Sequence, residues 1–144
     1  MSANDDRPAW STQRQLWWRD FDELGHLSAA RYADLYQEAA GDFVVEAWQD
    51  AEADYVVARL DITYLHEIRR QGSPVVLLVS AGRVGRSSFE LSMAVTSADG
   101  VLCSRAAGTY VAWDREERRS RTMTEAERSG LDSMSSPDTR RTHG

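Results

Sequence analysis

The chain contains no lysine, and all 17 of its basic residues other than histidine are arginine. This absence excludes a lysine Schiff base and a lysine nucleophile. Cys103 is the single cysteine, which excludes an internal disulfide, and the cysteine and histidines do not cluster as zinc ligands do. We therefore expect neither a metal nor a redox cofactor.

Long apolar runs are absent too. No stretch could cross a bilayer, and residues 1–10 are acidic and polar, without the apolar centre of a signal peptide. The formal net charge of -6 disfavours binding to nucleic-acid phosphates. The pattern predicts a cytoplasmic protein with neither a membrane nor a nucleic acid as its partner.

What the chain does contain is the composition of an ordinary globular protein, with 42% hydrophobic and 28% charged residues. Its 144 residues predict one domain with a single core. A domain of this size is small for a deep, closed site, and sites in small domains often form between subunits. We therefore expect a homo-oligomer.

A long amphipathic helix is the clearest element of the pattern. Ser28 is a suitable N-cap, and the helical periodicity continues to about Trp48. Gly41 weakens this helix slightly, so packing against an apolar surface must stabilise it. The apolar positions recur at steps of three and four residues and form one broad stripe: Tyr32, Leu35, Tyr36, Ala39, Ala40, Phe43, Ala47 and Trp48.

Strand patterns surround this helix in the sequence. Turn residues at Gly85-Arg86 and Asp99-Gly100 separate the last three strand segments, so these strands should pair antiparallel. One helix covers both faces of a five-stranded sheet only if the sheet curls around it. The segments with strand patterns are residues 12–19, 55–64, 74–79, 89–96 and 101–114.

The sequence therefore predicts an α+β domain, and its limits follow from composition. The domain should span residues 12–124, because strand and helix patterns fill that range. Residues 1–11 show no periodicity and are predicted to form a flexible arm. Residues 125–144 are rich in Ser, Thr, Pro and Arg and are predicted to be a disordered tail.

The segment richest in chemical groups lies directly before the predicted helix, at residues 20–28, with the sequence Asp-Phe-Asp-Glu-Leu-Gly-His-Leu-Ser. It brings an acid, a glycine and the unpaired amides of a helix start within a few residues of one another. Acyl transfer needs these parts: a group that attacks or activates water, and donors that hold a developing oxyanion. By residue type alone, Asp22 is also a common turn former.

The motif formed by Asp20, Asp22, Gly25, His26 and Tyr32 resembles that of the hotdog-fold thioesterases, in the branch typified by 4-hydroxybenzoyl-CoA thioesterase. The resemblance implies the hotdog fold, in which a five-stranded antiparallel sheet wraps around a long central helix. It also implies hydrolysis of an acyl thioester of coenzyme A or of an acyl carrier protein, in a homodimer or homotetramer whose pocket is lined from two subunits.

The extent of this resemblance is most of the chain. The order of elements is similar over residues 12–114, and the hairpin at residues 82–89 is similar to the one between the family's third and fourth strands. Two departures bear on substrate preference: Ser28-Ala29 replaces an asparagine pair, and residues 67–70 lack a proline that often precedes the third strand.

The resemblance also implies roles for three residues of the motif and its helix. Asp22 attacks the thioester carbonyl to give a mixed anhydride, or acts as general base for a water. The backbone amide of Ala29 polarises the carbonyl, which suits the positive end of a helix dipole. His26 orients a water or the acyl group, or has a structural role in closing the turn.

Further residues are implied in substrate binding. Gly25 and Tyr32 belong to the motif itself, and Ser87 lies in the hairpin with Arg83 and Arg86. The two arginines could pair with coenzyme A phosphates, which guanidinium groups recognise well, although arginines at hairpin turns are usually only solvated.

Three other polar residues are interpreted as structural or solvated rather than catalytic. Glu38 is placed like the catalytic glutamate of another hotdog branch, but it is predicted to lie on a polar helix face. Asp20 is interpreted as a solvated turn residue or a cap, and Cys103 as a buried, inert thiol.

Two alternative functions stay open: a hotdog dehydratase for hydroxyacyl thioesters, which needs a histidine paired with a second acid, and a non-catalytic module that binds acyl-CoA.

Overall fold

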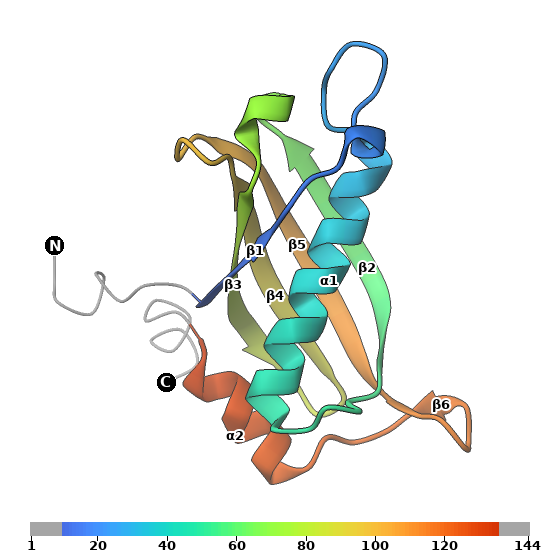
Figure 1. Cartoon of the computed structure of the whole chain (residues 1–144). Coiled ribbons are helices and arrows are strands. Elements are labelled where there is room, and N and C mark those ends of the chain that lie inside the picture. Colours follow the sequence, from blue (N-terminus) through green and yellow to red (C-terminus); the bar gives the residue numbers. More distant parts are fainter. Residues whose placement is uncertain (1–9, 136–144) are drawn as a thin grey trace, which may run out of the picture.

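The computed structural model describes residues 10–135, which form a curled sheet, a long helix packed against its concave face and a short C-terminal helix (Figure 1). The helices are α1 (Ala29–Trp48) and α2 (Glu125–Ser133), with 3-10 turns at η2 (Trp18–Asp20) and η3 (Arg70–Gly72). The strands are β1 (Trp10–Arg14), β2 (Tyr55–Tyr64), β3 (Val75–Val84), β4 (Ser88–Thr96), β5 (Leu102–Asp114) and β6 (Arg119–Ser120).

The sheet has the strand order β1-β3-β4-β5-β2, and all its neighbouring strands are antiparallel. The two-residue β6 pairs with the end of β5 and was not predicted. The predicted α+β class is confirmed, as are the five-stranded antiparallel path around a long helix and the antiparallel pairing of β3, β4 and β5.

The helix α1 has the predicted N-cap at Ser28 and its predicted end at Trp48. It ends because Gln49 takes a left-handed conformation with φ of 54°. The predicted stripe is buried, and the side chains of Leu35 and Phe43 are fully enclosed. Each such side chain contributes about 1.5–3 kcal/mol on burial, so contact with the sheet stabilises α1 despite Gly41.

The first strand differs from its prediction. It spans Trp10–Arg14 rather than residues 12–19, so part of the predicted flexible arm at 1–11 belongs to the sheet, while residues 1–9 lie outside the described range. The aromatic pair that suggested a strand ends in η2, where the Asp20 carboxylate accepts a hydrogen bond from the Trp17 amide at 2.7 Å. In this segment, a hydrogen bond to a nearby side chain therefore takes the place of the backbone hydrogen bonds that a strand would make in the sheet.

The C-terminal segment also differs from its prediction. Residues 125–133 form α2, so the predicted disordered tail at 125–144 is wrong for this part, and residues 136–144 lie outside the described range. Thr124 and Glu127 form a capping box at its start, and Leu131 is fully buried. Gly130 lets α2 approach α1 closely, because a Cβ there would stand 1.9 Å from the Ala47 carbonyl oxygen.

The topology brings three polar segments to one end of the sheet. Figure 1 shows the start of α1, the end of β2 and the turn η3 together at the top of the molecule, far from α2. The loop at residues 21–28 lies at this end as well, directly before α1. Within residues 10–135, no helix is long and apolar enough to cross a membrane.

Candidate active site

A groove of about 420 Å³ lies where these segments meet. Four of the predicted site residues, Asp22, His26, Ala29 and Tyr32, line it together. The other wall comes from the end of β2 and the segment that follows it, which sequence analysis did not assign to the site: Tyr64, Leu65, His66 and Glu67.

The Asp22 carboxylate closes the turn of the loop. Its Oδ1 accepts hydrogen bonds from the Leu24 amide at 2.9 Å and from the His26 amide at 3.0 Å. Gly25 takes φ of 78°, in the left-handed region that glycine enters without strain. The turn-forming interpretation of Asp22 is therefore correct, yet the residue is also exposed and lines the groove, so both of its predicted roles are compatible with the structure.

The backbone of the loop is fixed on both sides. The Leu27 amide donates to the Ile68 carbonyl at 2.8 Å, and the Ser28 amide donates to the Asp20 carbonyl at 2.9 Å. An isolated antiparallel bridge joins His26 to Arg69. These contacts hold the loop against the segment after β2, so the two walls of the groove are connected through the main chain.

Asp20 has a structural position, not a solvated one. Its residue surface is only 8% exposed, and its Oδ1 lies 3.3 Å from the Arg31 Nε. Because its other oxygen caps η2, the prediction of a cap is confirmed and that of a solvated turn residue is wrong.

The start of α1 lies at the groove without a side-chain cap. Ser28 makes no side-chain capping bond, so its hydroxyl does not occupy the first amides. Among the loop and cap hydrogen bonds of residues 10–135, none is donated by the Ala29 amide. Such an amide carries the positive end of the helix dipole, and Ala29 lines the groove, which makes it suited to stabilise an oxyanion.

A histidine–carboxylate pair stands in the same groove. The His26 Nε2 lies 2.5 Å from the Glu67 Oε2, and both side chains are a little over one-third exposed. Glu67 was missed because it lies far from the motif in sequence. The available signal was topological: β2 and α1 run oppositely, so the residues after Tyr64 come to the start of the helix.

Two tyrosines form the apolar floor of the groove. The Tyr32 ring packs edge-on against the Tyr64 ring, with centroids 5.0 Å apart. Burial raises the pKa of Tyr32 to about 12, so its phenol is neutral across the physiological range. Tyr64 is 52% exposed, so an apolar surface is left open at the edge of the groove.

The hairpin residues do not join this groove within one chain. Arg83, Arg86 and Ser87 lie around the β3–β4 turn, at the opposite end of the sheet (Figure 1). The backbone there has a structural use, because the Ser87 carbonyl accepts from the Ala112 amide at 2.8 Å and the Arg86 carbonyl from the Met123 amide at 2.9 Å. Their predicted contact with substrate would therefore require a second subunit.

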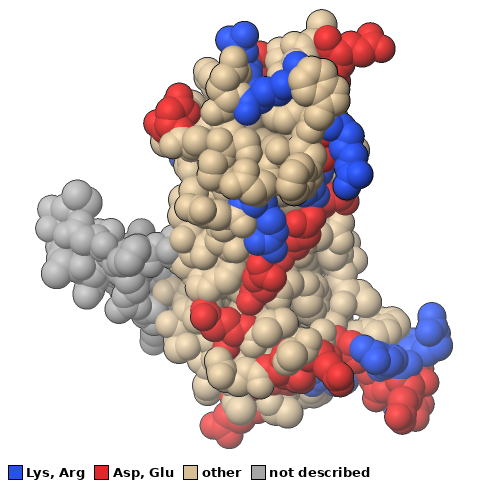
Figure 2. Space-filling view, viewed as in Figure 1, with Lys and Arg blue, Asp and Glu red and all other residues tan. Residues whose placement is uncertain are grey.

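Glu38 lies in a band of ion pairs over α1, visible as the diagonal row of charged side chains in Figure 2. Its carboxylate contacts the Arg14 guanidinium at 2.9 Å and that of Arg31 at 2.7 Å. Burial opposes ionisation of Glu38, but these hydrogen bonds outweigh it and lower the pKa of Glu38. The predicted polar-face position is confirmed.

Cys103 is fully buried, as predicted, and burial raises the pKa of its thiol. The thiol is therefore poorly suited to nucleophilic attack. Among the described residues, no three His, Cys, Asp or Glu side chains gather as ligands for a metal ion.

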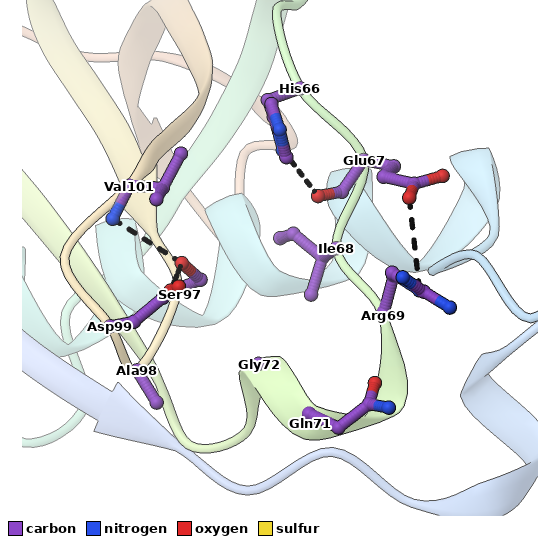
Figure 3. Close-up of a pocket in the computed structure, with 10 residues that line it drawn as sticks. All are labelled: His66, Glu67, Ile68, Arg69, Gln71, Gly72, Ser97, Ala98, Asp99 and Val101. Carbon is purple, nitrogen blue, oxygen red and sulfur yellow. Dashed lines mark hydrogen bonds and ion pairs between the residues drawn. The ribbon is translucent and has the colours of Figure 1, made fainter.

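A second hollow, of about 500 Å³, adjoins the groove (Figure 3). It lies between the segment at residues 66–72 and the turn at 97–101, and it shares His66 and Glu67 with the groove. Ser97 holds this turn, because its hydroxyl donates to the Asp99 carboxylate and accepts from the Val101 amide at 3.3 Å. The segment after β2 thus separates two neighbouring concave surfaces.

Comparison with known proteins identifies the family and the class of the fold. The model of the thioesterase-like superfamily matches residues 16–131, and the chain belongs to that family. Among curated proteins, none matches this sequence.

Solved structures give the same class. A Thermus thermophilus thioesterase complexed with coenzyme A and Zn is 26% identical, with a TM-score of 0.77 over 86% of this chain and 92% of that one. A Staphylococcus aureus protein in complex with CoA is 15% identical, with a TM-score of 0.78 over 89% and 85%. A 1,4-dihydroxy-2-naphthoyl-CoA thioesterase from Synechocystis is 13% identical, with a TM-score of 0.73 over 88% and 97%.

The last two similarities show the fold alone, because their sequence identities are low. Together with the family match, they confirm the predicted resemblance to hotdog-fold thioesterases.

Proposed function

We propose that the protein hydrolyses an acyl thioester of coenzyme A or of an acyl carrier protein to a free acid and a thiol. The supporting observation is one groove that is lined by both Asp22 and Ala29, the residue whose amide begins α1 and donates none of the loop or cap hydrogen bonds of residues 10–135. Membership of the thioesterase-like superfamily supports the same reaction class.

The chemistry follows two routes from the same residues. In the first, an Asp22 oxygen attacks the acyl carbon, the C–S bond breaks, and water then hydrolyses the mixed anhydride. In the second, Asp22 takes a proton from a water that attacks the acyl carbon directly, and the C–S bond then breaks as the departing sulfur takes up that proton to give the thiol. In both, the Ala29 amide stabilises the negative charge that develops on the carbonyl oxygen, a contribution of about 10²–10³ in rate for one donor.

Coenzyme A is supported as the thiol by two structural neighbours that hold it, from Thermus thermophilus and Staphylococcus aureus. The open groove with its exposed Tyr64 and Leu65 gives an apolar surface for an acyl group.

The test is a thiol-release assay with short, long and aromatic acyl-CoA substrates and with carrier-bound acyl groups. We expect release from at least one class. If the protein binds these thioesters and releases no thiol from any of them, the hydrolase assignment fails, and the non-catalytic acyl-CoA-binding module takes its place.

One observation favours a second candidate, the dehydratase for hydroxyacyl thioesters. That reaction needs a histidine paired with an acid, and the structure pairs His26 with Glu67 at 2.5 Å. The products separate the two reactions, because dehydration of a 3-hydroxyacyl thioester gives an enoyl thioester and no free thiol. Mass spectrometry of the products decides between them.

We also propose that the protein forms a homodimer through the free edge of β2. This strand ends the sheet, carries the exposed Val57 and leads directly to the open side of the groove. Arg59 and Asp61 lie two residues apart on this edge, with Nε and Oδ2 2.9 Å apart. Around a two-fold axis near Leu60, the Arg59 of each copy would stand opposite the Asp61 of the other.

Charge exchange tests this dimer. Asp61→Arg would place four guanidinium groups, from residues 59 and 61 of both copies, next to one another at the axis. Their repulsion should give monomers in sedimentation velocity. Arg59→Asp combined with Asp61→Arg places opposite charges across the axis again and should restore the dimer. Asp132→Arg, on the exposed face of α2, is the matched control and should leave the assembly unchanged. A dimer that survives Asp61→Arg would place the interface elsewhere.

A further inference from the structure

The contact between Glu67 and His26 joins two segments that are remote in sequence. His26 belongs to the loop before α1, and Glu67 follows β2. The Glu67 carboxylate contacts two partners: Oε2 lies 2.5 Å from the His26 Nε2, and Oε1 lies 3.8 Å from the Arg69 Nε. Figure 3 shows the Glu67 and Arg69 side chains directed away from the turn at residues 97–101.

The backbone beneath this pair is held firmly. The His26 amide donates to the Asp22 carboxylate at 3.0 Å, and the neighbouring Leu27 amide donates to the Ile68 carbonyl at 2.8 Å. His26 also forms its bridge with Arg69. The main chain therefore fixes both ends of the side-chain contact and keeps the imidazole in the same groove as Asp22.

We infer that Glu67 is a positioning residue that keeps a proton on Nε2 of His26 and leaves Nδ1 as the hydrogen-bond acceptor in the groove. An ionised carboxylate can only accept, so the imidazole nitrogen that faces it must carry the hydrogen. The other nitrogen of a neutral imidazole then has a free lone pair. This inference rests on the proposed thioester hydrolysis.

The tautomer decides what His26 can hold. An acceptor nitrogen binds a water, which can donate, and does not bind the acyl carbonyl, which can only accept. His26 thus orients the attacking water, while the Ala29 amide is left to bind the carbonyl oxygen. The two contacts act on the two reactants, as an ordered attack on the acyl carbon requires.

The test compares Glu67→Gln with the matched variant Glu23→Gln in the full chain. The amide of glutamine can donate or accept, so it no longer selects a tautomer. Glu23 is an exposed residue of the same loop, and the same chemical change there should leave the rates at their original values. We expect Glu67→Gln to lower kcat about tenfold or more and to leave KM within about twofold.

The second readout is independent of activity. Nitrogen chemical shifts of the His26 imidazole, assigned with a His26→Gln variant, report which nitrogen carries hydrogen. We expect the Nε2–H form in the original protein and a mixture in Glu67→Gln, with an unchanged Tm.

Three results would overturn the inference: hydrogen on Nδ1 in the original protein, an unaltered tautomer in Glu67→Gln, or unaltered kcat in that variant. A fall in Tm alone would show that the contact only ties the two segments together. If the original protein hydrolyses no thioester, the proposed function fails, and the tautomer measurement still tests Glu67.

Discussion

The two ends of α1 are treated differently by the fold. At its start, the Ser28 side chain makes no capping bond, and Ala29 lines a groove together with Asp22 and His26. At its other end, α2 covers the helix, with Gly130 against the Ala47 carbonyl. The comparison teaches that this small domain leaves one terminus of α1 open to a groove and packs the other against a second helix.

The largest effect should come from the open end. Asp22→Asn keeps an oxygen that can accept from the Leu24 and His26 amides, so the loop should keep its shape. The amide cannot attack or take a proton, and we expect kcat to fall by about 10²–10⁴ with little change in Tm. Steady-state thiol release checks this, and full turnover in the variant would remove Asp22 from the mechanism.

A change at the C-terminal end of α1, where α2 packs, should instead lower the free energy of unfolding. Leu131→Ala removes a fully buried side chain between α2 and the rest of the core, and it should cost about 2–5 kcal/mol of unfolding free energy. The activity of the molecules that stay folded should be unchanged. Urea unfolding measures the cost, with the exposed Ser129→Ala as control. A cost below about 1 kcal/mol would mean that α2 does not stabilise the domain.

The two helix starts offer a smaller and more direct comparison. Thr124 accepts a hydrogen bond from the Glu127 amide at 3.1 Å, whereas Ser28 makes no such bond. Thr124→Ala should therefore cost about 1 kcal/mol, and Ser28→Ala less than about 0.5 kcal/mol. Equal costs in thermal unfolding would show that Ser28 caps α1 in solution.

The smallest effect concerns pH. Hydrogen bonds with Arg121, partly opposed by burial, lower the pKa of Glu127 below its usual 4.5. A depressed folded-state pKa contributes stability at pH values above the unfolded pKa, and this stability is lost as the pH falls through the folded value. Tm measured from about pH 6 to about pH 3 should fall more steeply in the original protein than in Glu127→Gln. Parallel curves would contradict the assignment.

The sequence predicted the bounds of the elements with clear periodicity, α1 and β2. The stripe of α1 is buried, whereas the alternation of β2 corresponds only to the half-buried Leu60 and Ile62 between exposed residues. The polar helix α2 escaped because one capping box and one buried leucine gave too weak a pattern within a charged segment.

The site was predictable only where its residues are neighbours in sequence. Asp22, His26, Ala29 and Tyr32 lie within one turn and the helix after it, so a local motif contains them. Glu67 joins them through the pairing of two remote segments, which no local pattern encodes. The same limit explains why the position of the hairpin at residues 85–88, at the other end of the sheet, could not be read from its own residues.

The exposed aromatic residue of η2 has a consequence for optical measurements. The Arg70 guanidinium stacks 3.6 Å from the centroid of the Trp18 ring, and Trp18 is 76% exposed to solvent. Because η2 precedes the loop and η3 follows its pairing segment, any separation of the two segments would move the cation away from the indole. The emission of Trp18 would then change, which gives the molecule a built-in fluorescent reporter beside its groove.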